Sequence, residues 1–276
     1  MYTKGGGTEK ETEGSEVALE ETAITACITR AFCEDFLADL QLDVAIAGAG
    51  PSGITAARYL AQAGARTAVF ERNLHVGGGM WGGGMLFPRI VVQEEARLVL
   101  EEAGVRLREV EPGLYVADSV EAVSCSAAAA LRAGARIWVG MGVEDLVLRE
   151  DHRVCGVVLN WMAVERAGLH VDPMALRSRL VIDATGHDAE VCRTLTRKVK
   201  GLRLPTPEGT VIGERPMWAE KGEGSLVENT REVHPGLIVA GMTANAVFGS
   251  YRMGAVFGGM LLSGKRAAEL ALELLG

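Results

Sequence analysis

The sequence is short of the features that would direct a chain to a membrane, a secretory route or a metal–thiolate site. It has no run of apolar residues long enough to cross a bilayer. Its polar, acidic N-terminus is unlike a signal peptide. The cysteines stand singly at positions 27, 33, 125, 155 and 192, an odd number with no CxxC pair. We therefore expect reduced thiols in a cytoplasmic protein without a disulfide framework.

Positive charge is also in short supply. Lys and Arg number 28 against 36 Asp and Glu, which gives a formal net charge of −8. A protein that binds nucleic acid or an anionic membrane surface usually carries a basic excess. The charge balance therefore argues against both partners, although it allows a nucleotide to bind inside a pocket.

Glycine, in contrast, is abundant, with 35 residues in a chain of 276. The glycines cluster at 48–53, 77–84 and 249–259, as expected where backbone approaches a ligand closely. The length and the apolar content of 48% suffice for a sizeable core. We expect residues 1–19 to be a disordered acidic tail and residues 20–276 to be a single dinucleotide-binding catalytic domain.

Apolar periodicity predicts alternating helices and strands. Isoleucine and phenylalanine recur at four-residue spacing over 20–40, which predicts an amphipathic helix. Further helices are expected at 52–63, 93–103, 119–133 and 253–275. Strands are expected at 42–47, 65–71, 136–139, 143–149, 154–161, 179–184 and 236–240. The strands at 143–149 and 154–161 should pair antiparallel, whereas 195–235, which contains Pro205, Pro207 and Pro216, should be irregular.

The stretch GAGPSG at 48–53 fits the G-x-G-x-x-G pattern of a dinucleotide-binding turn. Gly48 permits the tight turn, Gly50 lets backbone approach a pyrophosphate, and Gly53 lets helix and strand pack closely. The following helix would turn its N–H groups and positive dipole end toward the phosphates. Glu71 closes the next strand, close to the position of an acid that accepts from ribose hydroxyls. The complete strand–turn–helix–strand–acid unit favours binding over a glycine turn without a ligand.

A second glycine cluster, GGGMWGGG at 77–84, follows this unit. Its six glycines around Met80 and Trp81 are more typical of a ligand lid than of a flexible loop. Arg72, beside the acid, either lies near an adenosine or is a solvated cation. These motifs do not separate FAD from NAD.

Two histidines bracket one predicted strand, His170 before it and His187 after it. His187 can enter the crevice at the carboxyl edge of the sheet, where open α/β sheets bind ligands. Asp172 lies 15 residues before His187, and the two could share a metal if chains pair or if the loop folds back. Spacing alone favours ordinary hydrogen-bonded histidines.

Arg252 lies in YRMGAVFGGM at 251–260 and is expected to open the last helix. An arginine at such a position can hold a carboxylate bidentately. The alternative is a surface arginine or the partner of an acid, and the residues alone leave both open.

Together these motifs resemble one family. GAGPSG, the ER pair at 71–72, GGGMWGGG, GLHVDP, DATGHD and YRMGAVFGGM occur in that order. The chain resembles, from about Ala23 to its C-terminus, the thiazole synthases that make the thiazole half of thiamin from NAD and glycine. The resemblance implies an α/β, FAD/NAD-binding, disulfide-reductase-like Rossmann-type fold, with a central parallel sheet and a small antiparallel insertion. It also implies a pentosyl-type transferase for which NAD is a substrate.

The resemblance assigns roles to particular residues. Those that would contact NAD, besides the glycines of the turn, are Ser52, Glu71, Arg72, Gly79, Val143 and Met242. His170, Val171 and Asp172 would reach the NAD of a neighbouring subunit. Asp172 and His187 would bind iron(II) from adjacent protomers of a homo-octamer. Arg252 would hold the carboxylate of glycine.

His170 decides which branch of the family the chain resembles. Eukaryotic members carry a cysteine there, which gives up its own sulfur so that each chain turns over once. Imidazole has no sulfur to give, so the resemblance is to the archaeal-type branch, which uses free sulfide repeatedly. His170 would then shuttle protons, for which its pKa range is suited. Cys192 follows TGHD closely but is expected to be a core thiol.

Three other functions remain open at this stage. An FAD-dependent oxidoreductase would use the first two glycine motifs equally well. A ribose-1,5-bisphosphate isomerase would need several cations for two phosphates, and only Arg252 is well placed. A non-enzymatic NAD-binding scaffold would leave NAD intact on long incubation.

Overall fold

The computed structural model describes residues 19–276, and these fall into two units. Apart from Leu19, the tail predicted for 1–19 lies outside the described residues. The first unit consists of helix α1, Glu21–Ala38, which confirms the helix expected there. The phenyl rings of Phe32 and Phe36 stack on it with their centroids 5.9 Å apart. The helix buries none of its residues.

The second unit, Asp39–Gly276, is built on an eight-stranded sheet whose strand order is β10-β11-β9-β1-β2-β6. Strand β8, Val154–Trp161, pairs with β9, and β7, Met141–Leu148, pairs with β8. The parallel strands are β1 Gln41–Ala47, β2 Thr67–Glu71, β6 Arg136–Val139, β9 Met174–Asp183 and β11 Leu237–Val239. Strand β10, Glu232–His234, is antiparallel to β11. This parallel-dominated sheet confirms the predicted fold class.

Four helices form the layers beside the sheets in this unit: α2 Pro51–Gln62, α3 Glu94–Ala103, α4 Ser119–Arg132 and α9 Gly258–Leu275. The buried faces of α2 and α9 meet the apolar side chains of β1, β2 and β9 in one continuous core. A Cβ atom on Gly264 would lie 2.3 Å from the carbonyl oxygen of Ser52, so only glycine lets α9 approach α2 this closely. The approach fixes the N-terminus of α2.

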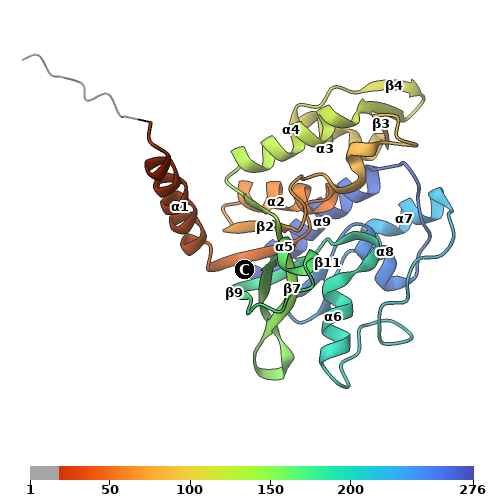
Figure 1. Cartoon of the computed structure of the whole chain (residues 1–276). Helices are drawn as coiled ribbons and strands as arrows, with labels where there is room; N and C mark the ends of the chain where they lie inside the picture. The colour runs from red at the N-terminus through yellow and green to blue at the C-terminus, as the bar shows by residue number, and fades with distance from the viewer. Residues whose placement is uncertain (1–18) are drawn as a thin grey trace, which may run out of the picture. The chain divides into compact units, whose positions relative to one another are not determined.

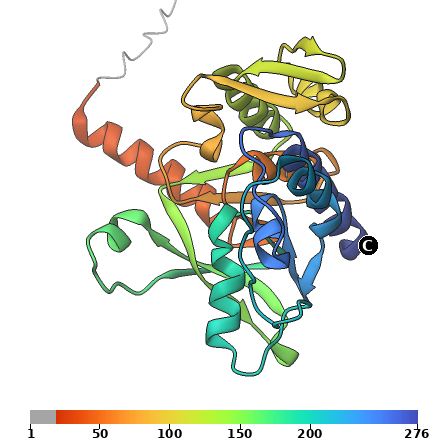
Figure 2. The ribbon, with the colours of Figure 1, turned by 90° about the vertical axis from the view of Figure 1, so that its right-hand side faces the viewer.

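A smaller antiparallel sheet has the order β3-β5-β4 and agrees with the antiparallel insertion of the predicted fold class, although its three strands were not among those expected from periodicity. Its strands are β3 Arg89–Gln93, β4 Arg108–Glu111 and β5 Leu114–Asp118. With α3 and α4 it forms the end of the unit opposite the β7 hairpin and α6, Glu190–Lys198 (Figures 1 and 2). A second core of buried side chains fills this end.

The antiparallel pair expected near 143–161 is confirmed as the hairpin of β7 Met141–Leu148 and β8 Val154–Trp161. A short 3-10 turn, η2 Glu150–His152, joins the two strands. No helix among residues 19–276 is both long enough and apolar enough to span a bilayer.

The strand expected at 179–184 is wrong at its start, because β9 begins at Met174. Leu176, Ser178 and Leu180 are buried, while Arg177 and Arg179 face solvent. The period-two alternation is present, but a buried serine hides it from an apolar count. A strand of ten residues spans roughly 30 Å at about 3.3 Å per residue.

The prediction that residues 195–235 are irregular is also wrong. The segment contains the end of α6, helix α7 Ala219–Asn229 and strand β10. Helix α7 is hard to predict because Gly222 and Gly224 lower its intrinsic helix propensity. A Cβ on Gly222 would lie 2.5 Å from the carbonyl oxygen of Tyr251, so tertiary packing selects this glycine.

The last helix was expected from residue 253 but begins at Gly258. Gly254 has a φ of +83°, which a helix excludes, and the backbone of Arg252 pairs with the segment before α7. Arg252 therefore lies on a loop between α8, Met242–Phe248, and α9, rather than opening α9. The sequence analysis also missed α5 Met162–Arg166 and the 3-10 turns η1 Gly78–Gly82 and η3 Gly186–Asp188.

Candidate active site

A cavity of about 840 Å³ lies where β1, β2 and β9 end. This is the carboxyl edge of the parallel sheet, where the predicted motifs should meet. The predicted site residues that line the cavity are Gly48, Gly50, Ser52, Glu71, Arg72, Gly79, Val143, His187, Met242 and Arg252. Gly53, His170, Val171 and Asp172 do not line it.

The GAGPSG turn has the geometry of a phosphate-binding turn. Gly48 has a φ of +97°, and a Cβ there would lie 2.5 Å from the carbonyl oxygen of Ala184. A Cβ on Gly53 would lie 2.0 Å from the carbonyl oxygen of Gly48, so Gly53 packs the helix on the turn and stays out of the cavity. Gly50, in contrast, has open space where a Cβ would be. Helix α2 starts at Pro51 without a side-chain cap, which leaves its N-terminus suited to an anion.

Glu71 is buried, and its two carboxylate oxygens brace the surrounding backbone. Oε2 accepts from the amide of Ala49 at 2.9 Å. Oε1 accepts from the backbone and side-chain nitrogens of Asn73 at 2.9 and 2.8 Å. Glu71 therefore holds the GAGPSG turn at 48–53, called the phosphate turn below, to the start of the loop that follows β2.

Arg72 forms an ion pair with Glu190 of α6, with Nη1 and Oε1 2.5 Å apart. Both side chains line the cavity. Burial raises the pKa of the Glu190 carboxyl, while the charge of Arg72 opposes the shift. The sequence analysis missed both Glu190 and α6, the helix that begins at this residue, because no motif distinguished Glu190 from the chain's other acids.

Within the second glycine cluster, residues Gly78–Gly82 form the 3-10 turn η1. The amide of Gly77 donates to the carbonyl of Ala49 at 2.6 Å, which ties the cluster to the phosphate turn. Met80 is fully buried, while the indole of Trp81 donates to the carbonyl of Val76. Gly79 is thereby placed in the cavity wall.

Ser52 and Met242 come together from distant parts of the chain. Gly241 has a φ of +64°, and a Cβ there would lie 2.2 Å from the hydroxyl of Ser52. Gly241 therefore brings the start of α8 against the start of α2, and both predicted contact residues line the cavity.

His187 lies on η3, directly after β9, and its Nδ1 is 2.8 Å from each carboxylate oxygen of Glu214. Glu214 Oε2 is also 4.0 Å from Nε of Arg252. One carboxylate thus contacts both polar residues that the sequence analysis placed here. The sequence analysis missed Glu214, because it lies in an irregular segment without periodicity.

The loop that carries His187 is held by Asp183, a fully buried carboxylate at the end of β9. Asp183 accepts from the amide and hydroxyl of Thr185 at 3.1 and 2.6 Å, and from the amide of Cys192 at 2.9 Å. Burial raises the pKa of the Asp183 carboxyl, and burial with this acid raises the pKa of the Cys192 thiol well above its usual range. Cys192 is a core thiol, as expected.

His170, Val171 and Asp172 are exposed on the connection between α5 and β9. The carbonyl of Val171 accepts from Asn160 Nδ2 at 3.3 Å. Asp172 precedes β9 and His187 follows it, so the strand's length of roughly 30 Å separates them. The loop does not fold back to unite the two residues within one chain.

An imidazole nitrogen and carboxylate oxygens suit iron(II) in donor chemistry. Within the chain that the structure describes, however, no three His, Cys, Asp or Glu side chains gather into a metal-binding group. His187 and Asp172 therefore fit an iron site only as ligands contributed by two copies.

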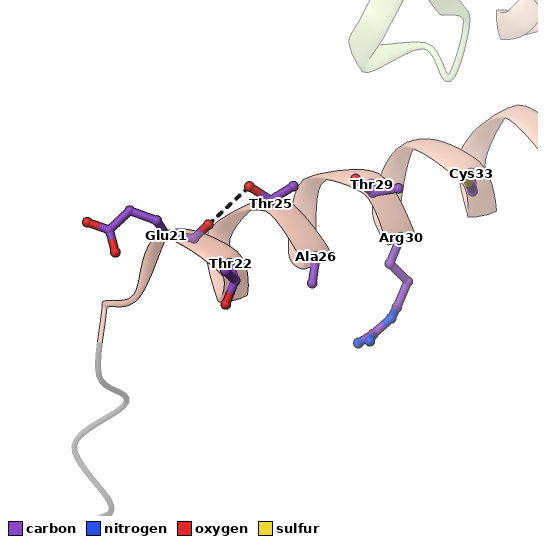
Figure 3. A pocket seen from close by; sticks show the side chains of 7 residues that line it. All are labelled: Glu21, Thr22, Thr25, Ala26, Thr29, Arg30 and Cys33. Atoms are coloured by element: carbon purple, nitrogen blue, oxygen red, sulfur yellow. Dashed lines mark hydrogen bonds between the residues drawn. The ribbon is translucent and has the colours of Figure 1, made fainter.

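A second hollow is confined to α1 and lined by Glu21, Thr22, Thr25, Ala26, Thr29, Arg30 and Cys33. Figure 3 shows these side chains along the helix, with the hydroxyl of Thr25 hydrogen-bonded to the carbonyl of Glu21. No other element contributes to it, so no chemical groups converge there.

The parallel sheet, the glycine turn at the N-terminus of α2 and the cavity at the carboxyl edge define an α/β protein of the dinucleotide-binding class. Comparison with known proteins narrows the class. Residues 25–257 match the model of the Thi4 family, and the chain belongs to this family, the thiazole synthases of thiamin biosynthesis. The resemblance inferred from the motifs is thereby confirmed.

Three relatives illustrate how far the likeness extends. The thiamine thiazole synthase of Methanothermobacter thermautotrophicus is 53% identical over 257 residues, 93% of this chain and 99% of the relative. That of Methanococcoides burtonii is 53% identical over 258 residues, 94% and 99% of the two chains. The crystal structure of Thermovibrio ammonificans THI4 superposes with a TM-score of 0.89 at 50% identity, over 93% of this chain and 98% of that one. The chain is therefore an enzyme of thiazole biosynthesis.

Proposed function

We propose that the chain converts NAD, glycine and free sulfide into the ADP-linked thiazole carboxylate precursor of thiamin, with release of nicotinamide. The reaction is that of a pentosyl-type transferase, requires iron(II) and runs over many turnovers. One observation carries the proposal. A single cavity joins a phosphate-binding turn at Gly50 and Ser52 to an arginine, Arg252, and an imidazole, His187.

The turn and its neighbours suit the ADP part of NAD. The pyrophosphate lies at the N-terminus of α2, where N–H groups and the helix dipole stabilise its charge. Glu71 and Arg72 face the adenosine ribose, and the backbone at Val143 faces the adenine. Val143 and Arg72 lie close together, because a Cβ added to Gly142, the residue before Val143, would lie 3.5 Å from Cβ of Arg72. Ser52, Gly79 and Met242 complete the contacts.

Arg252 holds the carboxylate of glycine, because a guanidinium can bind both carboxylate oxygens at once. Water replaces nicotinamide, and the freed ribose opens to its aldehyde and isomerises to a ketose. The amine of glycine condenses with the ketone as an imine, with loss of water. Sulfide then adds, and ring closure with loss of water gives the thiazole. His170 from a neighbouring copy moves protons during these steps.

His187 of one copy and Asp172 of another would hold iron(II), which would supply Lewis-acid chemistry when bound. The active form is consequently an oligomer, which we take to be the homo-octamer implied by the family resemblance, in the cytoplasm.

The cysteines support an external sulfur source. None of the three cysteines in residues 39–276 lines the cavity. Cys125 and Cys155 are half-buried elsewhere, and Cys192 is fully buried with its thiol pKa raised. A thiol that gives up its sulfur needs access to the substrate and thiolate character.

An anaerobic incubation with NAD, glycine, iron(II) and sulfide tests the proposal, with mass spectrometry of the small molecules and the intact protein. Product in excess over protein, with the protein mass unchanged, is the expected result. Product limited to one per chain, with the protein lighter by one hydrogen sulfide, would show that a cysteine donates. Intact NAD without product would reject the proposal and favour a flavin enzyme or a binding scaffold.

A further inference from the structure

Glu214 belongs to the strap, which we define as residues 199–218 between α6 and α7. Its side chain is only 10% exposed although the strap runs along the surface. Both of its carboxylate oxygens are 2.8 Å from Nδ1 of His187, and Oε2 is 4.0 Å from Nε of Arg252. The carboxylate therefore lies behind the polar wall of the cavity.

The backbone on either side of Glu214 is fixed by hydrogen bonds to α8 and the loop after it. The amide of Gly213 donates to the carbonyl of Ala246 at 2.8 Å, and the amide of Arg215 donates to that of Ser250 at 2.8 Å. The amide of Arg252 donates in turn to the carbonyl of Arg215 at 3.2 Å. The side chain of Glu214 thus starts from a rigid position, which a residue that orients another must have.

The contact with Glu214 determines which nitrogen of His187 is available. A carboxylate accepts, so Nδ1 carries a proton, and Nε2 is the ring nitrogen left to bind a metal. Carboxylates that receive a hydrogen bond from a histidine in this way fix the ring's tautomer and orientation for metal binding. Arg252, at the longer distance, offsets the negative charge of a carboxylate that is almost out of solvent.

We propose that Glu214 is a positioning residue that fixes the His187 imidazole with Nε2 as its metal-binding atom. The inference rests on the proposed function, because that function makes His187 an iron ligand. Glu214 acts through His187 and needs no contact with NAD, glycine or the metal.

The test measures cobalt(II) binding by the full-length chain under anaerobic conditions, by calorimetry and by visible absorption. Cobalt(II) stands for iron(II) because its absorption reports the number and kind of ligands. We expect Glu214→Gln to weaken binding about tenfold and Glu214→Ala up to about a hundredfold. The unaltered chain and Glu208→Gln, which changes an exposed glutamate of the same strap outside the cavity, should bind alike.

Two further measurements separate positioning from general damage to the site. KM for NAD should stay near the value of the unaltered chain in Glu214→Gln, because the Glu214 side chain does not line the cavity. In a His187→Ala background, Glu214→Gln should weaken residual cobalt(II) binding no further. Thermal unfolding identifies a variant that fails to fold, and the near-isosteric glutamine variant then carries the test.

The possible results distinguish the two proposals. If the unaltered chain makes the thiazole product and Glu214→Gln binds cobalt(II) equally well, the role of Glu214 is refuted while the function stands. A further loss on adding Glu214→Gln to His187→Ala would likewise refute it. If the unaltered chain neither forms product nor binds cobalt(II), the proposed function fails and the role of Glu214 fails with it.

Discussion

The phosphate turn and the wall that carries His187 and Arg252 line the same cavity but are built in different ways. The turn comes from one continuous segment, 41–71, in which strand, glycines, helix and acid follow in order. The other wall comes from the end of β9, the strap and the loop before α9, joined by hydrogen bonds between distant residues. We call the first the local unit and the second the assembled wall. A local unit can be recognised from its residues, whereas an assembled wall depends on contacts between distant residues that the sequence does not show.

The largest effect should come from breaking the local unit with Gly53→Ala. The new Cβ would lie 2.0 Å from a backbone oxygen that cannot move without opening the turn. We expect the free energy of unfolding to fall by roughly 3 kcal/mol, the scale of an overpacked core site. Chemical denaturation measures the change.

Gly50→Ala is the matched control, since its φ of −72° suits alanine and the Cβ meets open space. Stability should stay within about 0.5 kcal/mol of the unaltered chain, the range of substitutions away from packed sites. Binding of NAD should weaken, because the methyl group would enter the space proposed for the pyrophosphate. Equal stability losses in the two variants would contradict the proposal that Gly53 is needed for packing and Gly50 for binding the pyrophosphate.

The assembled wall can be broken with Arg252→Ala. Losing a charge-assisted contact of about 1.5–3 kcal/mol should raise KM for glycine by roughly 10- to 100-fold. Binding of NAD to the opposite wall should be retained, and steady-state kinetics with calorimetry would separate the two. A parallel loss of affinity for NAD and glycine would show that the walls do not act independently.

Glu223 gives a smaller effect that sharpens the comparison, because it joins α7 to α9 behind the assembled wall. Its Oε1 accepts from Gln93 Nε2 at 2.6 Å and from the amide of Gly259, while its Oε2 and Gln93 Oε1 are buried acceptors that lack a donor. Burial raises the pKa of the Glu223 carboxyl. The folded state therefore binds its proton more tightly than the unfolded state, so this contribution is complete below the unfolded pKa and declines as pH rises toward the folded value.

Glu223→Gln would supply the missing donor and remove the ionisation. We expect about 1 kcal/mol of added stability at pH 7 and a flatter stability profile above roughly pH 4.3, the ordinary pKa of a glutamate. Denaturant melts at several pH values would measure both. Lower stability at pH 7, with an unchanged profile, would count against a raised pKa at this position.

The smallest change in stability should follow Arg72→Ala. The side chains of Arg72 and Glu190 are 42% and 36% exposed, and such ion pairs contribute about 0–1 kcal/mol. Affinity for NAD should nevertheless fall, because Arg72 lines the cavity beside Glu71. Glu190→Gln serves as a control that breaks the same pair and leaves the arginine. If it weakens NAD binding as much as Arg72→Ala does, the arginine acts through the pair alone.

Much of this cavity could be predicted from sequence, and the physical reasons for success and failure differ by region. Gly48, Gly50 and Glu71 were found because turn geometry and helix polarity constrain residues that lie close together in sequence. The parallel sheet and the family followed from the same order of motifs. These predictions depend on short-range rules, which one sequence can express.

The failures around the cavity involve contacts over long sequence distances. Glu214 and Glu190 look like ordinary acids until β9 and α6 bring them to His187 and Arg72. Arg252 was expected to open the last helix, whereas its backbone is hydrogen-bonded to Arg215 and Trp218 of the strap. Helix α7 was missed because its two glycines are chosen for close packing and not for helix propensity.

The hydrogen bonds of Glu71 have a consequence for the kinetics of binding. The phosphate turn is held to β2 and to the second glycine cluster by the protein's own atoms, at Ala49 and Gly77. The conformational entropy of this turn is therefore lost when the chain folds and not when a nucleotide arrives. Association at the turn should approach the rate of diffusional encounter, and differences in affinity among nucleotides should arise from how fast each one leaves.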